Sequence, residues 1–558
     1  MRYHRMAKAG SNIKANCTGS GLRRCLLALA VLVFSILAGD YTASLYGQAP
    51  SNSQATLAVL EDALSTGERF EERSQWSDAL RHYQQSIKHF PRQAELHRRL
   101  VTAKAHVDVD RRYSDASFSR SLRVLDHRLA IDVLEEILLK IDTYYVDSPN
   151  WNRMCDVGSR FVAVALESPS FLEFHGVANN RARITPARKQ IADWAGTSRI
   201  QTRRALMTHI SMASQYVSRQ TGISSQSIVM EFVSGVMASM DRYSAFLTGN
   251  QLDETFSQIE GNFVGLGVEL KIQKNCLEIV RVIPKGPASL AGIVSGDRIV
   301  EVDRQRIGLL PSDVAADMLK GREGSTVDLC LTTSENHTKR LTVTRKRVVL
   351  PGVENVHVVD EENGVGYMRI ASFQKTTDRD VEAALWKLHR MGMKRLIIDV
   401  RGNPGGLLSA GVHVANRFIK DGRIVATRGR SDNEDVDYTA NAIGTWSVPL
   451  VVLIDGNSAS ASEIFAGAIA DTNRGTIVGN RSFGKGSVQG IFPLSSFNCG
   501  IRLTTAKFYS PSGRTISMNG VVPDVVVQQV AKPMSDGTLP LAQSDPVLAV
   551  GIKRVVSK

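Results

Sequence analysis

Two continuous apolar runs in the second half of the chain constrain its fold more than any other feature. They are Arg395-Leu-Ile-Ile-Asp-Val400 and Val448-Pro-Leu-Val-Val-Leu-Ile-Asp455, each followed by a turn of small residues and then a helical pattern. A strand that is apolar at nearly every position is buried on both faces, as in the sheets of α/β proteins. Residues 348–530 are therefore predicted to form an α/β domain, with its site at the carboxyl ends of the strands.

The segments before and after this domain predict other kinds of structure. Apolar residues at helical spacing favour helices over 120–250, in which the polar stretch 180–225 is expected to be an insertion or a long surface connection. Short strand-like runs and glycine turns mark 255–347 as a small β domain. Residues 531–558 are expected to be a peripheral tail. A chain of 558 residues has room for this many domains.

Residues 55–107 also predict helices. Trp76, Tyr83 and Phe90 recur at helical spacing before Pro91, which resembles one tetratricopeptide unit. Such arrays need about three units to bury a core. An ordinary helical hairpin packed on the next domain is the alternative, whereas the tetratricopeptide interpretation would provide a surface for an adaptor protein.

The N-terminal segment, residues 1–49, predicts export. Basic residues ending in Arg23-Arg24 precede an apolar run at 26–38, which is shorter than the roughly 20 residues of a membrane span. This pattern is typical of a secretory signal, with a cleavage site at Gly47-Gln48-Ala49. An uncleaved membrane anchor is the alternative. Both interpretations place the rest of the chain outside the cytoplasm, in the periplasm or secreted.

Charge and cysteine content argue against two other classes of function. The net charge of +13 is spread in short clusters with no nucleic-acid-binding module, so it predicts solvated surface. The six cysteines form no Cys-x-x-Cys pair and no cluster with histidine, so no metal site is expected. Cys276 and Cys330 lie in the predicted β domain, either as a disulfide of an oxidising compartment or as buried free thiols.

The first candidate catalytic segment is Asp455-Gly-Asn-Ser-Ala-Ser-Ala-Ser-Glu463, which joins the second apolar run to a helix expected to begin near Ala461. A serine at a helix N-terminus lies near free N–H groups and a positive dipole, which favour the oxyanion of an acyl transfer. The same residues fit a capping box with Ser460 at the N-cap and Glu463 at N3. Taken alone, this segment favours the structural role.

The second segment is Ser482-Phe-Gly-Lys485-Gly-Ser-Val-Gln489, which follows another short strand pattern. A lysine between glycines is usually solvated. A serine nucleophile nevertheless needs a base, and a lysine kept neutral by burial can serve. None of the 12 histidines lies in a glycine-rich turn beside a strand end, so no histidine competes for this role.

The β domain resembles a PDZ domain through Gly261-Asn-Phe-Val-Gly-Leu-Gly-Val-Glu-Leu270 and the segment 286–303. A PDZ domain adds an extended peptide to a sheet edge and holds its terminal carboxylate with loop N–H groups. The resemblance implies a carboxylate-binding loop at Gly265, Leu266, Gly267 and Val268, and a groove-walling helix at 314–320. A generic small β domain is the alternative.

The two candidate segments, with Asp399-Val-Arg-Gly-Asn-Pro-Gly-Gly-Leu407 and a segment at 503–516, resemble the carboxyl-terminal processing proteases, the tail-specific proteases of peptidase family S41. The resemblance implies a multidomain α/β protein with a helical N-terminal region, a PDZ domain and a spiral α/β core like those of crotonase and the Clp peptidase. It implies a serine endopeptidase with a Ser–Lys dyad, needing no cofactor or metal. Its partners would be protein substrates, recognised by their carboxyl termini and cut nearby.

Carried over residue by residue, the resemblance makes Ser460 the nucleophile and Lys485 the general base. Their supporting residues would be Gln489, which orients the lysine, the backbone N–H groups of Ala461 with Gly405 or Gly406 as the oxyanion hole, and Glu463 and Asp471 as further support. Asp471 has a structural role as its alternative. Ser458 and Ser462 are disfavoured by their positions relative to Glu463. Gly402 stands where many members of the family have asparagine.

Two other classes of function stay open on the sequence. A scaffold would bind peptides through the PDZ domain and the helical repeat without cutting them, although an intact Ser460, Lys485 and Gln489 argue against it. A hydrolase of the same core fold would act on non-peptide substrates, and the PDZ domain argues against that interpretation.

Overall fold

The structure of the chain, a computed structural model, describes residues 52–197, 199–273, 275–309, 318–333, 337–527 and 545–557. The predicted signal or anchor at 1–49, including the apolar run at 26–38, lies outside these residues. The chain divides into two compact units, Met1–Val59 and Leu60–Lys558. Apart from residues 52–59 of the first helix, the features described below belong to the second unit.

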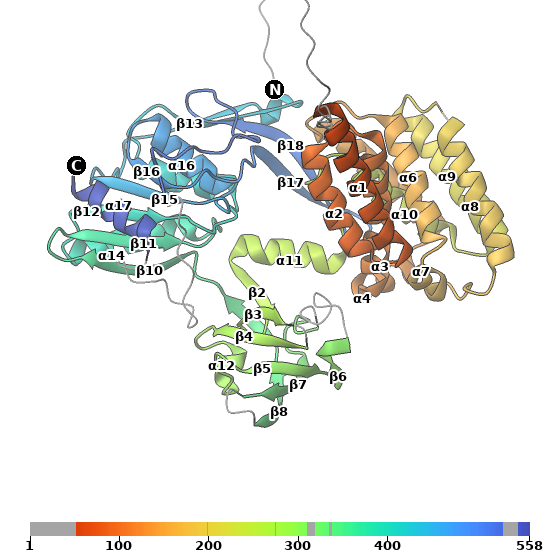
Figure 1. Cartoon of the computed structure of the whole chain (residues 1–558), viewed down its shortest axis with the longest axis horizontal. Helices are drawn as coiled ribbons and strands as arrows, with labels where there is room; N and C mark the ends of the chain where they lie inside the picture. The colour runs from red at the N-terminus through yellow and green to blue at the C-terminus, as the bar shows by residue number, and fades with distance from the viewer. Residues whose placement is uncertain are drawn as a thin grey trace, which may run out of the picture. The chain divides into compact units, whose positions relative to one another are not determined.

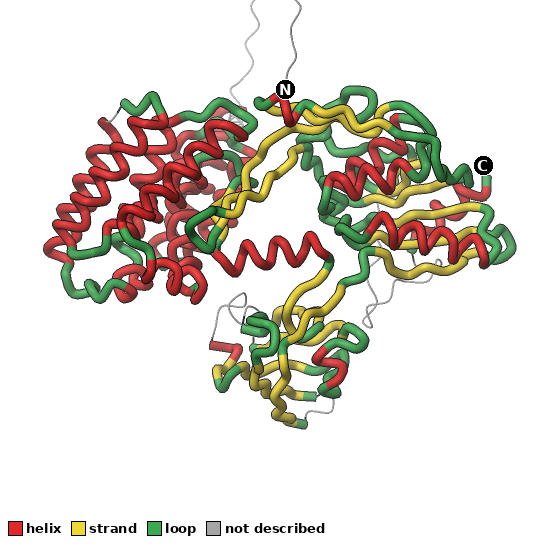
Figure 2. The backbone as a smooth tube through the Cα atoms, turned by 180° about the vertical axis from the view of Figure 1, so that it is seen from behind, coloured by secondary structure: helices red, strands yellow, loops and turns green. Residues whose placement is uncertain are grey.

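Within the described residues from 52 to 260, the chain is helical apart from one short strand (Figure 2). Its elements are α1 (Asn52–Glu72), α2 (Trp76–His89), α3 (Ala94–Ser114), α4 (Ala116–Val124), α5 (His127–Tyr144), α6 (Trp151–Ala165), α7 (Pro169–Phe174), α8 (Arg181–Thr197), α9 (Arg203–Thr221), α10 (Ser225–Ala238), β1 (Ala245–Leu247) and α11 (Gly249–Glu260). Helices α5, α6, α9 and α10 supply most of one hydrophobic core.

The stretch 180–225 is not a long surface connection, and that alternative is wrong, whereas the alternative of an insertion stays a prediction. It forms α8 and α9, and Leu206, Ile210, Ala213 and Val217 of α9 are buried in the helical core. These residues follow one another at spacings of three and four, so they lie on one face of the helix. The high polar content of the other faces hides this stripe in the sequence.

The segment 55–107, predicted to be helical, lies within α1, α2 and α3. Ala79, Tyr83, Leu96 and Ala103 form a small core between these helices. Helix α3 also contributes Ala105 and Val109 to the core of the following helices. The three helices are therefore packed on the next part of the chain, as the hairpin interpretation expects.

The β region contains a separate sheet with its own core. Its elements are β2 (Asn262–Gly265), β3 (Val268–Gln273), β4 (Cys276–Val282), α12 (Pro287–Leu290), β5 (Arg298–Val302), β6 (Gln305–Arg306), η1 (Ile307–Leu309), β7 (Thr326–Thr332), β8 (Thr338–Thr344) and β9 (Lys346–Val349). The sheet order is β3-β4-β5-β7-β8, which leaves β3 at an edge, while β2 pairs with β9. Cys276 and Cys330 are buried free thiols, as are Cys155 and Cys499.

The second half of the chain contains the α/β sheet that positions the candidate site (Figure 1). The sheet has the order β10 (Val353–Asp360), β11 (Val365–Ile370), β12 (Arg395–Asp399), β15 (Leu450–Ile454), β16 (Thr476–Gly479) and β19 (Val525–Val526). The strands from β11 to β19 are parallel, and β10 is antiparallel to β11. The two apolar runs are thus neighbouring strands.

Both faces of this sheet are covered, as the continuous apolar runs predict. Leu396 and Ile398 of β12 lie in a core with helices α14 (Thr377–Arg390), α15 (Leu408–Asn416) and α16 (Ala461–Asp471). Ile397, between them, points to the opposite face and packs with Val547 and Val555 of helix α17 (Pro546–Val556). Residues 545–557 are therefore part of the core, and the prediction of a peripheral tail is wrong for them. Residues 531–544 of that predicted tail lie outside the described residues.

A second sheet connects the α/β core with the helical region. Its long strand β18 (Gly500–Tyr509) pairs with β1, with β13 (Arg423–Gly429) and with β17 (Ser487–Pro493), while β14 (Val436–Thr439) pairs with β13. Ile501 and Leu503, near the start of β18, lie in the helical core. Phe508, near its end, lies in the α/β core. One strand therefore contributes to both cores.

Candidate active site

Ser460 lies at the junction between β15 and α16, where the sequence predicts the nucleophile. It is the N-cap residue of α16, with a φ of 57° and a ψ of −114°. A positive φ is uncommon for a residue with a side chain and costs free energy. The strained turn leaves Ser460 partly exposed, whereas Ser458 and Ser462 are buried and donate to the backbone oxygens of Val400 and Asn403. Of the three serines, only Ser460 is open to a substrate.

Glu463 joins the turn that carries Ser460 to the turn that carries Lys485. Its fully buried carboxylate accepts hydrogen bonds from the Ser460 N–H (2.8 Å) and the Ser482 hydroxyl (2.6 Å). It also accepts the N–H groups of Gly484 (2.7 Å) and Lys485 (2.9 Å). The sequence suggests only the first of these contacts, the N3 position of a capping box. The carboxylate therefore holds both candidate catalytic turns in one arrangement.

Lys485 is half-buried and its Nζ lies 5.0 Å from the centre of the Tyr243 ring. Burial lowers the pKa of this lysine below its usual value, and the nearby cations Arg502 and Arg242 lower it further, against the opposing effect of Glu463. Among the described residues, no carboxylate forms an ion pair with Lys485. A lysine in these surroundings loses its proton more readily than a solvated one and can act as a base.

The loop between α10 and β1 forms the other side of the lysine site. Tyr243 lies on this loop, its ring faces the Arg242 guanidinium at 4.7 Å, and its carbonyl oxygen accepts a hydrogen bond from Arg502 Nε (2.8 Å). Arg502 itself is on β18. The cations that act on Lys485 therefore come from the junction with the helical region, which the sequence motifs of the core do not include.

Replacing Arg242 by glutamine is expected to move the rising limb of the activity–pH profile to higher pH. Removing this cation withdraws one of the causes that lower the pKa of Lys485, so a higher pH is needed to deprotonate it. The profile of kcat/KM against pH measures the shift. Arg379→Gln, which removes an exposed charge from α14, is the control. An unchanged profile for the Arg242 variant would refute the electrostatic role.

The turn Gly405-Gly406 lies directly against Ser460. A Cβ atom on Gly405 would meet the Ser460 Cβ at 2.7 Å and the Ala461 nitrogen at 2.9 Å. Gly405 has a φ of 101° and Gly406 a φ of 145°, which glycine adopts without strain. The Gly405 N–H donates to the side chain of Asn403 (2.8 Å), while the described hydrogen bonds use neither the Gly406 nor the Ala461 N–H. Of the predicted oxyanion-hole donors, Ala461 and Gly406 are the two that remain available.

Asn403 is a further candidate residue of the site, to which the sequence analysis assigned no role. It is fully buried, its Nδ2 donates to the Ile370 carbonyl (2.9 Å), and its carbonyl accepts from Ala459 N–H (3.0 Å) and the Ser462 hydroxyl (3.0 Å). It thus fixes the glycine turn to the serine turn. The position of Asn403 two residues before Gly405 is the only sequence signal for this role.

The two remaining predicted site residues of the protease core form hydrogen bonds with residues outside this arrangement. Gln489 is on β17, and its side-chain amide donates to the Ser487 hydroxyl (2.9 Å). Asp471 ends α16, at the end of the helix opposite Ser460, and accepts hydrogen bonds from Ser512 N–H (3.0 Å) and from Arg514. Eleven residues of helix separate the two ends by roughly 15 Å. These contacts favour the structural interpretation of Asp471.

The predicted carboxylate-binding loop connects β2 to β3. The carbonyls of Leu266 and Gly267 accept the N–H groups of Ala288 and Ile283, both at 2.8 Å. The described hydrogen bonds do not use the N–H groups of Leu266 and Gly267, and Gly267 has a φ of 76°. The loop ends at Val268, the first residue of the edge strand β3. Of the predicted groove helix at 314–320, only 318–320 are described; Met318 and Leu319 lie in a turn, and Leu319 is buried.

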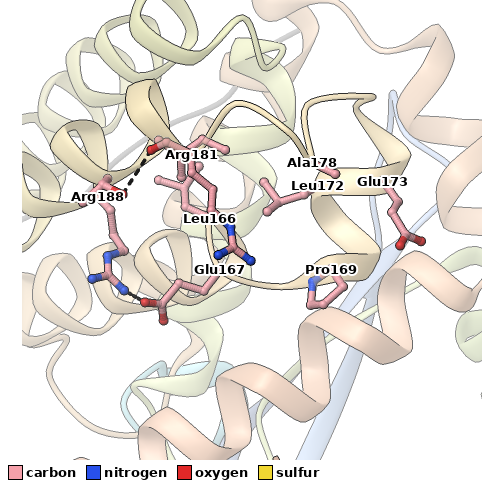
Figure 3. Close-up of a pocket in the computed structure, with 10 residues that line it drawn as sticks. Leu166, Glu167, Pro169, Leu172, Glu173, Ala178, Arg181 and Arg188 are labelled. Carbon is pink, nitrogen blue, oxygen red and sulfur yellow. Dashed lines mark hydrogen bonds and ion pairs between the residues drawn. The ribbon is translucent and has the colours of Figure 1, made fainter.

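Other features of the described residues do not belong to this site. A hollow between α6, α7 and α8 is lined by Leu166, Leu172 and Arg188, among others, and contains no residue from either catalytic turn (Figure 3). Over the described ranges no group of histidine, cysteine and carboxylate side chains could hold a metal ion. None of the described helices has both the length and the apolar character of a membrane span.

Two regions of the chain match known protein families. Residues 364–527 match peptidase family S41, and residues 278–331 match the PDZ domain. The chain is 35% identical over 311 residues to a carboxy-terminal-processing protease of Bartonella bacilliformis, covering 54% of this chain and 70% of that protein. It is 36% identical over 284 residues to a carboxyl-terminal-processing protease of Synechocystis, covering 50% of this chain and 65% of that protein.

Among solved structures, the chain is similar to the photosystem II D1 C-terminal processing protease. The similarity covers 76% of this chain and 97% of that chain, with 25% sequence identity and a TM-score of 0.41. The predicted fold class, a helical N-terminal region followed by a PDZ domain and an α/β protease core, is confirmed by the family matches and the observed elements.

Proposed function

Because the chain belongs to the carboxyl-terminal processing proteases of peptidase family S41, serine-type proteases with a PDZ domain, we propose that it cleaves proteins near their carboxyl termini with a Ser460–Lys485 dyad. The observation that carries this proposal is the buried Glu463 carboxylate, which binds the backbone of both turns. A carboxylate that accepts hydrogen bonds from both turns fixes two segments that are distant in the sequence in one geometry. Such preorganisation is what a two-residue catalytic unit requires.

The proposed reaction has two halves, acylation of Ser460 and hydrolysis of the acyl-enzyme. Ser460 Oγ attacks the peptide carbonyl while Lys485 Nζ accepts the hydroxyl proton, and the N–H groups of Ala461 and Gly406 stabilise the oxyanion. When the tetrahedral intermediate breaks down, Lys485 returns the proton to the leaving amine. Water then attacks the acyl-enzyme while Lys485 Nζ accepts its proton, and Lys485 returns that proton to Ser460 Oγ as the new carboxyl terminus leaves. The attacks by Ser460 and by water both need Lys485 uncharged, which its lowered pKa favours.

The PDZ domain is the proposed reader of the substrate. PDZ domains bind peptide carboxyl termini, and three features of this one support the same mode. The N–H groups of Leu266 and Gly267 are available to a carboxylate, the loop leads into β3, and β3 is an edge strand to which a peptide can be added. We therefore propose that the substrate tail binds here and that the cut falls upstream of it.

A substrate with a blocked terminus tests this proposal. An unfolded protein that ends in apolar residues with a free carboxylate is expected to be cleaved more efficiently than the same protein with an amidated terminus. Hydrogen bonds to a charged group contribute about 1.5–3 kcal/mol, so kcat/KM should fall by roughly 10- to 100-fold on amidation. Cleavage by trypsin, which does not read the terminus, is the control for unchanged accessibility. Equal rates for both forms with this protease would contradict tail recognition.

The remaining proposals concern the setting of the enzyme. We place the protease outside the cytoplasm, released or anchored through residues 26–38, because the N-terminal segment has the pattern of an export signal. An adaptor protein is a further proposed partner, through α1 to α3. The scaffold and non-peptide hydrolase alternatives are less well supported, because family membership points to a serine-type protease.

A further inference from the structure

The second face of the α/β sheet is closed by a short helix near the end of the chain, and this helix begins beside the active-site turn. Asp545, the N-cap of α17, is fully buried and accepts the N–H groups of Val547 (3.1 Å) and Leu548 (3.0 Å). Its carboxylate therefore caps the N-terminus of α17. The same carboxylate also contacts a residue from a distant part of the sequence, which a helix cap alone does not require.

That residue is Arg401, in the turn that follows β12. Arg401 Nη1 lies 3.0 Å from Asp545 Oδ1 and Nη2 lies 2.8 Å from Oδ2, a bidentate pair. On its other side Arg401 Nε donates to Asp399 (3.0 Å), whose carboxylate also accepts the Tyr367 hydroxyl (2.8 Å). Among the described hydrogen bonds, Asp545 is the only acceptor for Nη1. Because all four side chains are buried, a variant without the Asp545 carboxylate leaves Arg401 Nη1 with no acceptor among the described hydrogen bonds, while Asp399 still accepts from Nε and Nη2.

Arg401 is connected to the oxyanion-hole turn through consecutive backbone contacts. The Asn403 N–H donates to the Val400 carbonyl (3.2 Å) across a turn with Arg401 and Gly402 at its centre. The Gly402 N–H donates to Asp455 Oδ1 (2.9 Å). Asn403 Oδ1 then accepts the Gly405 N–H (2.8 Å), one residue before the Gly406 N–H, which no described hydrogen bond uses. The position of Arg401 therefore bears on the position of the Gly406 donor.

We infer that Asp545 is a positioning residue for the protease reaction, because it holds Arg401 and through it the turn that presents the Gly406 N–H to the oxyanion. This inference rests on the proposed function. The helix α17 is then part of the active-site scaffold as well as of the hydrophobic core. A purely structural role would affect only the stability of the fold, whereas a positioning role affects the rate of the chemical step in protein that remains folded.

The reaction of the full-length chain with a fluorophosphonate tests this inference without knowledge of the natural substrate. The reagent phosphonylates an activated serine, and its phosphoryl oxygen occupies the oxyanion hole in the transition state. We expect Asp545→Ala to lower the maximal labelling rate by about 10- to 100-fold, the effect of displacing an oxyanion donor by a fraction of its hydrogen-bond length. The half-saturating reagent concentration should stay within about twofold, since the ground-state contacts are unchanged.

Two further variants separate positioning from stability. Val555→Ala removes a buried contact of α17 far from Arg401 and should label at the wild-type rate below its melting temperature. Asp545→Asn keeps the size and one acceptor, so its rate should fall between those of wild type and Asp545→Ala. It also serves in place of the alanine variant if that variant does not fold.

The labelling rates distinguish failure of this inference from failure of the proposed function. If Asp545→Asn labels as fast as Val555→Ala, or if only the half-saturating concentration changes, the inference is wrong and the proposed function stands. If the wild-type chain does not label at Ser460, the proposed function itself fails. A graded loss of maximal rate in the order wild type, Asp545→Asn, Asp545→Ala, with wild-type rates for Val555→Ala, supports the positioning role.

Discussion

Ser460→Ala should abolish proteolysis while the protein stays folded and still binds substrate tails. Removing the nucleophile eliminates the acyl-enzyme route, and losses of roughly 10³- to 10⁶-fold in kcat are typical when a member of a catalytic unit is removed. The variant differs by one oxygen atom, and the Ser460 N–H keeps its hydrogen bond to the Glu463 carboxylate. Cleavage of an unfolded protein, followed by mass spectrometry of the products, measures the loss.

The matched control for this variant is a serine-like residue that is only a helix cap. Thr202, the N-cap of α9, accepts the Ala205 N–H at 3.1 Å and lies outside the site. Thr202→Ala should lower the free energy of unfolding by about 1 kcal/mol and leave activity intact. If Ser460 were merely the cap of α16, Ser460→Ala would behave in the same way, losing some stability and no activity. That result would end the assignment of the nucleophile.

Lys485→Met should reduce kcat/KM by a factor of roughly 10³ or more, because the serine then has no base. For the wild type, kcat/KM should rise with pH as the lysine loses its proton, since only the neutral amine can accept the serine proton. Burial, Arg502 and Arg242 lower the pKa of Lys485. The increase in kcat/KM should therefore occur at a lower pH than it would with an exposed lysine as the base. Rates measured across the pH range at which the fold is intact provide the profile.

Two variants distinguish a base from a simple positive charge. Lys485→Arg keeps the cation but cannot lose its proton at accessible pH, so it should be as inactive as Lys485→Met. Lys387→Met, which replaces an exposed lysine of α14, should leave both the rate and the profile unchanged. Activity in the arginine variant, or a flat wild-type profile, would rule out Lys485 as the base.

Much of the catalytic core is predictable because its signals are local. The two apolar runs specify strands buried on both faces, and the structure places them as neighbours, β12 and β15. The helix after Ser460 begins at Ala461, as the capping pattern indicates. The available Ala461 and Gly406 N–H groups fit the predicted oxyanion hole, although the role of each stays a prediction.

The contacts that hold the site together are not local, and the sequence does not reveal them. Glu463 binds the backbone at Gly484 and Lys485, some 20 residues away, and Asp545 binds Arg401 from 144 residues away. No period or composition marks such pairs. The helix α17 did have a local signal, since Asp545-Pro546 before an apolar segment is typical of a helix start, with an N-cap carboxylate and proline at N1. The prediction of a peripheral tail at 531–558 did not take this helix start into account.

The strand β18 has a practical consequence for dividing this protein into parts. Ile501 and Leu503 fill the core of the helical region, and Phe508 fills that of the α/β sheet. A fragment cut at 348–530 would carry the first two residues into water with their partners removed, and burying such a side chain is worth about 1.5–3 kcal/mol. A protease core excised at these predicted domain boundaries is therefore expected to aggregate. Chimaeras that exchange helical regions between such enzymes would need to exchange residues 494–503 with them.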